Sequence, residues 1–259
     1  MKKRFDMNAD AGESFGLWQI GADAELFPHI TSANIACGAH AGDPTVMRKT
    51  IELAALHQVA IGAHPGYPDL QGFGRRAMTI DPEEIHDMVV TQIGALQAMA
   101  HIFGMRLQHM KLHGALYNTA AQNAAIAQAV CRAALKLDAE LIVVTLAGSV
   151  MAKISQDMGL RTAEELFIDR GYAEDGTLLP RSHPHAIVSD AVEIDHRAEL
   201  LTTSGVIQTE GGLLLPRHCV TLCVHSDTPN AAAIAARAKQ AFRLAGAEIC
   251  PMAEILAYR

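Results

Sequence analysis

The chain has 259 residues, half of them hydrophobic and only 19% charged, so it can bury a sizeable core and is expected to form one domain over residues 1–259. Its formal net charge of −7 argues against a nucleic-acid surface, which needs clustered lysines and arginines. No uncharged apolar run is long enough for a transmembrane helix, so we expect no membrane association.

The N-terminus does not resemble a secretory signal. Residues 1–4 are basic, but the polar stretch Asp6-Met7-Asn8-Ala9-Asp10 follows where a signal peptide needs apolar residues. The five cysteines are odd in number and include no Cys-x-x-Cys pair, so they form neither a disulfide framework nor a zinc-knuckle spacing. We therefore expect a cytoplasmic protein with reduced thiols.

Strands and helices alternate along the chain. The pattern predicts strands near residues 4–10, 31–37, 58–63, 107–113, 140–146, 163–169 and 219–225. Asp43-Pro44 and Asp81-Pro82 each combine an N-cap side chain with proline at the first helical position. The helix after Asp81 should end at Gly104. Further helices are predicted near 120–136, 147–158, 188–202 and 229–245.

Seven strands and about six connecting helices predict an α/β fold, a closed or nearly closed (β/α) barrel, with an open doubly wound sheet as the alternative. In both folds active sites lie at the carboxyl ends of the strands. Residues 171–184 and the turn-rich run 203–216 are predicted to cover this mouth, with a small hairpin among them.

The first strand has an inverted alternation. Asp6, Asn8 and Asp10 share one face, and apolar residues share the other. In a parallel barrel both faces are buried, so three polar side chains on one face need ligands or partners. The alternative is an edge strand whose polar face is solvated.

Ionisable residues also mark later strands. His109, Lys111 and His113 share one face of the fourth strand, which weakens the edge-strand alternative. His40 follows the second strand among small residues, and His64 ends the third strand before a Pro-Gly turn. One such histidine is more often structural than a ligand, but several of them at strand ends favour a site.

Glu165 and Asp169 share one face of the sixth strand, and Arg170 follows them. They belong either to the site or to a structural ion-pair network, and the sequence leaves both open. Cys37, close to His40, is interpreted as a small buried residue because no cation next to the thiol would lower its pKa. Cys223 is interpreted as core-lining.

Two local motifs are discounted. Gly12-Glu13-Ser14-Phe15-Gly16 matches the nucleophile elbow of α/β-hydrolases, but it follows the first strand with no oxyanion motif upstream. Gly72-Phe73-Gly74-Arg75-Arg76-Ala77 matches a dinucleotide fingerprint, yet no helix is predicted to begin before Asp81. The chain also contains no P-loop sequence.

Several segments resemble the LamB/YcsF family, the A subunits of bacterial ATP-dependent 5-oxoprolinase, formerly called lactam utilisation proteins. The resemblance is carried by Met7 to Glu13, Ser32 to Pro44, Gly62 to Asp69, Gly72 to Arg76, His113 to Asn118 and Asp169 to Tyr172. Leu112 stands where the family usually has proline in Lys-Pro-His-Gly, and Ser226 where it has glycine in His-Gly-Asp. Both departures keep the ionisable residues.

The resemblance implies a seven-stranded (β/α) barrel similar to that of metal-dependent polysaccharide deacetylases. It also implies cleavage of 5-oxoproline to glutamate with ATP, together with separate B and C subunits. A five-membered lactam is little strained and its amide is resonance-stabilised, so ring opening gains from activation of the carbonyl oxygen, for example by phosphorylation. Without a nucleotide-binding motif, this chain would use ATP through the complex, bind the ring and add water.

We assign catalysis to Asp10, Glu13, Lys111, His113 and Asp169, and substrate binding to Asn8, Arg75, Glu165, Arg170 and His225. Asp10 is expected to act as general base or metal ligand, and Glu13 to protonate the leaving nitrogen. Lys111 or Arg170 would bind the substrate carboxylate. His113 would donate a hydrogen bond to the developing oxyanion.

A divalent metal is a further hypothesis. Its expected ligands are Asp10, His40 and His64, since a carboxylate with two imidazoles leaves positions open for water. Two other functions remain open. A stand-alone metal-dependent carbohydrate deacetylase would act on N-acetylated sugars without ATP, whereas a non-catalytic subunit would only deliver substrate and would tolerate Asp10→Asn.

Overall fold

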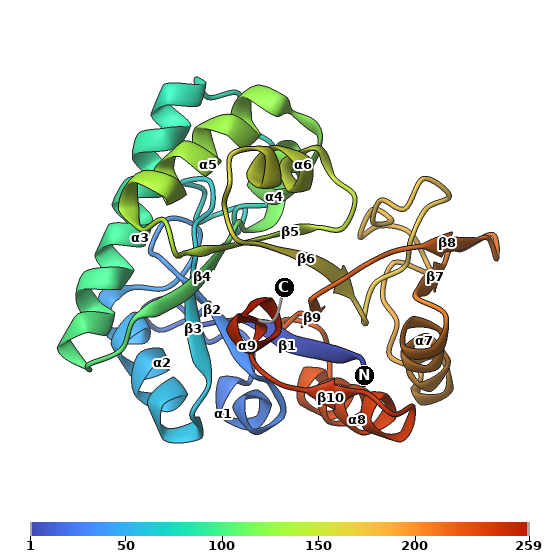
Figure 1. The fold of residues 1–259 in the computed structure, drawn as a ribbon. Coiled ribbons are helices and arrows are strands. Elements are labelled where there is room, and N and C mark those ends of the chain that lie inside the picture. Colours follow the sequence, from blue (N-terminus) through green and yellow to red (C-terminus); the bar gives the residue numbers. More distant parts are fainter. Residues whose placement is uncertain (1, 258–259) are drawn as a thin grey trace.

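The computed structural model describes residues 2–257, and the centre of the fold is a closed barrel of seven parallel strands (Figure 1). The strands are β1 (Arg4–Ala11), β2 (Ser32–Ala36), β3 (Ala60–His64), β4 (Leu107–Lys111), β5 (Ile142–Leu146), β6 (Thr162–Phe167) and β9 (Thr221–Val224). Because β1 pairs with both β2 and β9, the sheet closes on itself. The predicted barrel is confirmed, and the open doubly wound sheet is excluded.

Helices follow the strands and cover the outside of the barrel (Figure 1). They are α2 (Pro44–His57), α3 (Pro82–Ile102), α4 (Gly114–Gln122), α5 (Ala124–Leu137), α6 (Val150–Asp157), α7 (Ala191–Thr203) and α8 (Ala231–Leu244). Asp43 and Asp81 accept hydrogen bonds from amides of the first turns of α2 and α3, as predicted for N-caps. Within residues 2–257 no helix is long and apolar enough to cross a membrane.

One predicted helix is divided in the structure. The helix expected near 120–136 consists of α4 and α5, because the Asn123 side chain accepts hydrogen bonds from the amides of Ala125 and Ile126 and starts a new helix. The predicted hairpin is present, formed by β7 (Val206–Gln208) and β8 (Leu214–Pro216).

Four short elements were not predicted. They are α1 (Asp23–Leu26), the 3-10 helix η1 (Phe27–His29), β10 (Glu248–Ile249) and α9 (Met252–Leu256). Strand β10 pairs with the start of β1, and α9 lies at the amino-terminal end of the barrel (Figure 1). There the Met252 amide donates to Asp6 Oδ1 at 3.2 Å, and Met252 packs in a buried cluster with Ile142 and Val144. This contact closes the end of the barrel opposite the predicted site.

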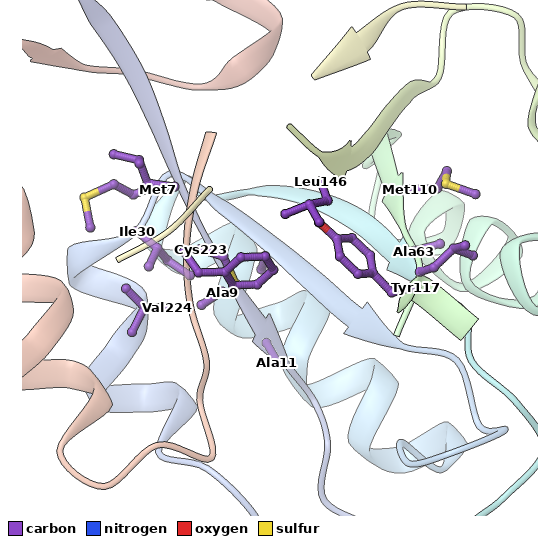
Figure 2. Packing of buried hydrophobic residues seen from close by; sticks show 14 of the residues in the cluster. Met7, Ala9, Ala11, Ile30, Ala63, Met110, Tyr117, Leu146, Cys223 and Val224 are labelled. Carbon is purple, nitrogen blue, oxygen red and sulfur yellow. The ribbon is translucent and has the colours of Figure 1, made fainter. Parts of the chain in front are cut away.

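The two faces of β1 are both buried. Asp6, Asn8 and Asp10 point into the barrel, whereas Met7 and Ala9 belong to the hydrophobic cluster shown in part in Figure 2. Since β1 lies between β2 and β9, the edge-strand alternative is wrong. The inverted alternation of β1 therefore indicates that the interior of the barrel is polar.

Hydrogen bonds between strands give the polar side chains of the barrel interior their partners. Asn8 Nδ2 donates to Glu165 Oε1 at 2.8 Å and to Thr221 Oγ1 at 2.6 Å. Asn8 Oδ1 accepts from Asn34 Nδ2 at 2.7 Å. These partners come from β6, β9 and β2, so one amide side chain connects four strands and avoids the cost of a buried polar group without partners.

Asp6 is a fully buried carboxyl group of this interior. It accepts hydrogen bonds from the hydroxyls of Thr31, Ser32 and Thr221 and from the Met252 amide. Burial raises the pKa of Asp6 to about 6, and these hydrogen bonds oppose the rise.

We predict that Asp6 makes folding stability depend on pH. Because its folded pKa is raised from 3.8 to about 6, its contribution is fully present below the unfolded pKa and is lost as pH rises through about 6. Relative to Asp6→Asn, the wild type should gain about 2 kcal/mol of unfolding free energy when pH falls from about 7.5 to about 4.5. Urea unfolding of both proteins measures this difference, and a difference that stays constant with pH would contradict the assignment.

Candidate active site

A cavity of about 760 Å³ opens at the carboxyl ends of the barrel strands. Seven of the predicted site residues line it: Asp10, His64, Arg75, Lys111, His113, Arg170 and His225. Residues 175–181 form another part of the wall, as predicted for the segment that covers the mouth. The other predicted site residues are buried and do not line the cavity: Asn8, Glu13, His40, Glu165 and Asp169.

Lys111 carries a buried ammonium group at the centre of the site. Its Nζ lies 3.1 Å from Asp10 Oδ1 and 3.1 Å from Glu165 Oε1. It also lies 3.2 Å from Asn8 Oδ1 and 2.9 Å from Cys223 Sγ. Burial opposes the charge, but Asp10, Cys223 and Glu165 raise the pKa of Lys111 well above its usual range.

These contacts limit what Lys111 can do. An ammonium group has three protons, and four acceptors already surround this one. Lys111 therefore has no proton left for a further acceptor, and its ammonium group holds the surrounding carboxylates.

Cys223 makes a contact inside the barrel that the sequence did not predict. It is buried as predicted, but its sulfur contacts Lys111 inside the barrel. Thr221 and His225 share its strand face, and Thr221 bonds to both Asn8 and Asp6. The alternation of these residues along β9 was the sequence signal that could have predicted this contact. Cys37, by contrast, has its pKa raised to about 12 by burial, which agrees with a structural role.

Asp10 presents an ionised carboxylate to the cavity. Its Oδ1 contacts Asn34 Nδ2 at 2.9 Å, Lys111 Nζ at 3.1 Å and His64 Nε2 at 3.4 Å. Burial opposes ionisation, but His64 and Lys111 lower the pKa of Asp10 well below its usual range. No donor within residues 2–257 bonds to Oδ2, so this oxygen can accept a hydrogen bond from a ligand or a water molecule.

His225 and Asp169 form a pair at another side of the cavity. His225 Nδ1 lies 3.1 Å from both carboxylate oxygens of Asp169, which also accepts from the His225 amide and the Thr228 hydroxyl. Burial opposes ionisation, but His225 lowers the pKa of Asp169. With Nδ1–H directed at Asp169, Nε2 is the nitrogen left for the cavity. Asp169 thus lies behind His225.

The ion-pair network considered for Glu165, Asp169 and Arg170 does not form among these three residues. Glu165 bonds to Lys111 and to the Tyr117 hydroxyl, and Asp169 bonds to His225, so the two carboxylates do not share a partner. The buried Arg170 instead donates to the carbonyl oxygens of Leu179 and Ala186. Arg170 thereby fixes the segment that forms one wall of the cavity.

Arg75 occupies the rim of the cavity. Its Nη2 lies 2.6 Å from Asp227 Oδ2, and its guanidinium carbon lies 4.9 Å from the centre of the Phe73 ring. Asp227 is also 3.5 Å from Arg181 Nη2, so this carboxylate connects the loops after β3, β6 and β9.

Four buried residues form a compact group beside Asp10: Glu13, His40, His64 and His113. Glu13 Oε1 lies 3.2 Å from His113 Nδ1, 3.4 Å from His40 Nε2 and 4.0 Å from His64 Nε2. Burial opposes ionisation, but His113 and His40 lower the pKa of Glu13 far below its usual range. The rings of His40 and His113 stack with their centres 3.7 Å apart.

This group differs from the predicted metal ligands. Asp10 was predicted together with His40 and His64, but the compact group contains Glu13 and His113 in place of Asp10. Asp10 lies next to His64 and falls into a second group with Cys223 and His225. The sequence pattern identified all of these residues, but it could not show which carboxylate lies nearest the imidazoles.

A strained loop holds His113. Phe73 and Gly74 have positive φ angles of 53° and 63°, and the Phe73 carbonyl accepts from His113 Nε2 at 2.8 Å. A Cβ atom at Gly74 would lie 2.8 Å from both His113 and His40, so this position requires glycine. From the sequence this loop was discounted as a dinucleotide motif and counted among the segments that carry the family resemblance, but its contact with His113 was not predicted.

Known proteins match this chain over nearly its whole length. A family model described as LamB/YcsF family matches residues 5–257. A Pyrococcus furiosus protein, named as the A subunit of 5-oxoprolinase, is 47% identical over 253 residues, covering 98% of this chain and 99% of that protein. A Bordetella pertussis protein of the same name is 47% identical over 231 residues, covering 89% of this chain and 92% of that protein.

Solved structures show the same fold. The crystal structure of a lactam utilization protein from Thermus thermophilus matches with a TM-score of 0.90 and 42% identity, covering 96% of this chain and 99% of that chain. A putative cellobiose-phosphate cleavage protein from Enterococcus faecalis matches with a TM-score of 0.59 over 98% of this chain and 99% of that one. At 12% identity the second likeness concerns the fold alone.

We predict that Lys111→Met destabilises the protein by about 3–5 kcal/mol, because it leaves buried carboxylates without a compensating charge. The double variant Lys111→Met/Glu165→Gln should recover about 1–3 kcal/mol of this loss, since one uncompensated charge is also removed. Urea unfolding of the wild type, both single variants and the double variant gives the coupling. A Lys111→Met protein as stable as the wild type would show that the ammonium group is not needed.

Proposed function

Because the chain belongs to the LamB/YcsF family, we propose that it is the A subunit of an ATP-dependent 5-oxoprolinase and opens the lactam ring of 5-oxoproline to give L-glutamate. One observation carries the proposal: an ionised carboxylate, Asp10, and a His225–Asp169 pair face the same cavity. Hydrolysis of an amide needs a base for the attacking water and an acid for the leaving nitrogen, and the two groups supply this combination.

In the proposed reaction Asp10 Oδ2 accepts a proton from water as the oxygen attacks the ring carbonyl carbon. His225, when protonated and held by Asp169, donates Nε2–H to the ring nitrogen as the C–N bond breaks. His225 was predicted only to bind substrate, and its position gives it this larger role. Asp169 acts through His225 and is a positioning residue.

Two roles proposed from the sequence are revised. Glu13 was expected to protonate the leaving nitrogen, but it does not line the cavity, and its Oε1 faces the ring nitrogens of His113 and His40. His113 was expected to donate to the oxyanion, but its Nε2 faces the Phe73 carbonyl and its Nδ1 faces His64 and Glu13. Neither nitrogen of His113 is left to donate into the cavity.

The cations of the cavity wall support an anionic substrate. Arg75, Arg170, Arg181 and Arg217 all line it. A guanidinium group can bind a carboxylate through two parallel hydrogen bonds, and 5-oxoproline carries one carboxylate. An ATP-derived phosphoryl group on the carbonyl oxygen would add further negative charge to the same ligand. Attack by one water and cleavage of the C–N bond would then leave an acyl phosphate, and a second water would hydrolyse it to glutamate and inorganic phosphate.

We assign the use of ATP to partner subunits B and C, because the chain contains no P-loop sequence. An unstrained, resonance-stabilised lactam then reaches this chain in an activated form. We also propose a cytoplasmic location, since the five cysteines are buried and include no Cys-x-x-Cys pair, a pattern more usual for a reducing compartment than for a disulfide framework.

We predict that the purified chain neither hydrolyses ATP nor opens 5-oxoproline at a useful rate, and that adding subunits B and C produces both activities. Glutamate and inorganic phosphate are measured with each combination of chains. Ring opening by this chain alone without ATP would contradict the division of labour. Release of acetate from N-acetylated sugars by the chain alone would instead identify a carbohydrate deacetylase.

We predict that His225→Gln lowers glutamate formation by the reconstituted complex by a factor of about 10² or more, because general acid catalysis is lost. Asp169→Asn should lower kcat with a smaller effect on KM, since it alters the orientation of His225. His101→Gln, an exposed change on α3, is the matched control and should keep full activity. Unchanged turnover in His225→Gln would remove His225 from the mechanism.

A further inference from the structure

Two backbone carbonyls fix the protonation pattern of the buried histidines. His64 Nδ1 lies 2.8 Å from the Lys111 carbonyl oxygen, and His113 Nε2 lies 2.8 Å from that of Phe73. A carbonyl oxygen only accepts, so each of these nitrogens carries the proton. In neutral rings His64 Nε2 and His113 Nδ1 therefore both carry lone pairs, and they face each other at 3.0 Å. Two lone pairs at this distance repel unless a cation lies between them.

Glu13 adds a third electron donor at the same place. Its Oε1 lies 3.2 Å from His113 Nδ1 and 4.0 Å from His64 Nε2. This oxygen is buried, and within the described residues 2–257 it has no hydrogen-bond donor. Ligand atoms bound tetrahedrally to zinc at about 2.0–2.1 Å are separated by about 3.3 Å. The three observed separations, 3.0, 3.2 and 4.0 Å, lie around that value.

The surrounding charges also favour a cation with two positive charges. Asp10, Glu13 and Glu165 are buried carboxylates in a region where Lys111 supplies one ammonium group. Glu165 accepts from Asn8, Tyr117 and Lys111, as expected of a carboxylate. Three buried carboxyl groups thus lie around one ammonium group, and buried negative charge is costly unless it is compensated.

A shared proton is a weaker explanation. One proton between His64 Nε2 and His113 Nδ1 would satisfy that contact, but it would leave the buried Glu13 Oε1 without a partner.

From this geometry we propose that His64 Nε2, His113 Nδ1 and Glu13 Oε1 bind one divalent transition-metal ion of the zinc type. Imidazole nitrogens with one carboxylate suit zinc and related metals, and they do not suit magnesium. The carbonyl contacts of His64 and His113 are the outer contacts that orient histidine ligands. His64 and His113 line the cavity, so a further coordination position faces the substrate space.

His40 is not one of the three ligands in this arrangement. Its ring is parallel to that of His113, with an interplanar angle of 3° and centres 3.7 Å apart. Lone pairs lie in the ring planes, so two stacked imidazoles cannot both direct them at one ion. His40 Nε2 instead lies 3.4 Å from Glu13 Oε1 and supports the position of that carboxylate.

The ion would extend the proposed function. Only the chemical use of the ion rests on that function; the binding of the ion does not. A metal beside Asp10 would polarise the substrate carbonyl or bind the attacking water. Binding of the ion itself depends on three side chains and is measured without substrate, so the metal site and the lactam activity can fail separately.

A second group of possible ligands must be separated from this site. His183, His185 and Glu210 lie near the surface, with His185 Nδ1 3.0 Å and His183 Nε2 3.4 Å from Glu210 Oε1. Unlike the buried group, it is open to solvent, and His185 is exposed. His185→Gln therefore serves as the matched control.

The test uses the full chain without a histidine tag, stripped with a chelator and titrated with ZnCl₂ alone in a calorimeter. We expect one tight zinc per chain, and we expect MgCl₂ to give no comparable binding. Glu13→Gln keeps the shape of the side chain and should weaken zinc binding by about 10²-fold or more, whereas His185→Gln should bind like the wild type. Circular dichroism of the stripped variants checks that they remain folded.

His64→Gln provides a second variant with the same expectation if Glu13→Gln does not fold. Absorption spectra of the Co²⁺ form report the coordination geometry and should change in both buried-site variants. No tight zinc binding by the wild type would overturn the proposal. Zinc binding that is lost in His185→Gln and kept in Glu13→Gln would also overturn it.

Discussion

The buried ammonium group of Lys111 holds the interior of the barrel together. It contacts side chains from β1, β6 and β9, including two carboxylates, and it projects from β4 itself. A charge in this position is stable only because every nearby acceptor is directed at it, and the carboxylates are stable only because it is present. Asp10 and Lys111 themselves line the cavity, so the cavity wall is built directly on this arrangement.

The same constraint explains why the barrel interior is polar below the cavity. Seven strands that close on themselves bring alternate residues of β1 face to face with those of β2, β6 and β9. Asn8 and Asp6 then form hydrogen bonds with side chains on three neighbouring strands. At the opposite end of the barrel, α9 closes the interior through the Met252 amide. Polar groups at the active end are therefore fixed by hydrogen bonds from below, which is the preorganisation that catalysis needs.

Local signals in the sequence were sufficient for much of the fold. The Asp-Pro pairs start α2 and α3 as expected, and the inverted alternation of the first strand correctly indicated a buried polar face. Short elements such as α9 have too few residues for a periodic pattern, so their presence depends on tertiary contacts. Asn123 was missed because an N-cap inside a continuous apolar pattern looks like an ordinary helix residue.

The site was predictable as a set of residues, but the role of each member depended on contacts that sequence does not contain. Backbone carbonyls of Phe73 and Lys111 fix the histidine tautomers, and those of Leu179 and Ala186 hold Arg170. Such contacts depend on loop conformation, including the positive φ of Phe73, and not on residue type. For this reason the roles that we propose for Glu13, His113 and Lys111 differ from those expected from the sequence.

The most direct test of the account concerns Asp10 in the complex with subunits B and C. Asp10→Asn keeps the shape of the side chain and removes the carboxylate that faces the cavity. Glutamate formed from 5-oxoproline and ATP is measured together with circular dichroism and assembly with the partners. The account predicts a folded, assembled variant that forms almost no glutamate. Full glutamate formation by Asp10→Asn would contradict it.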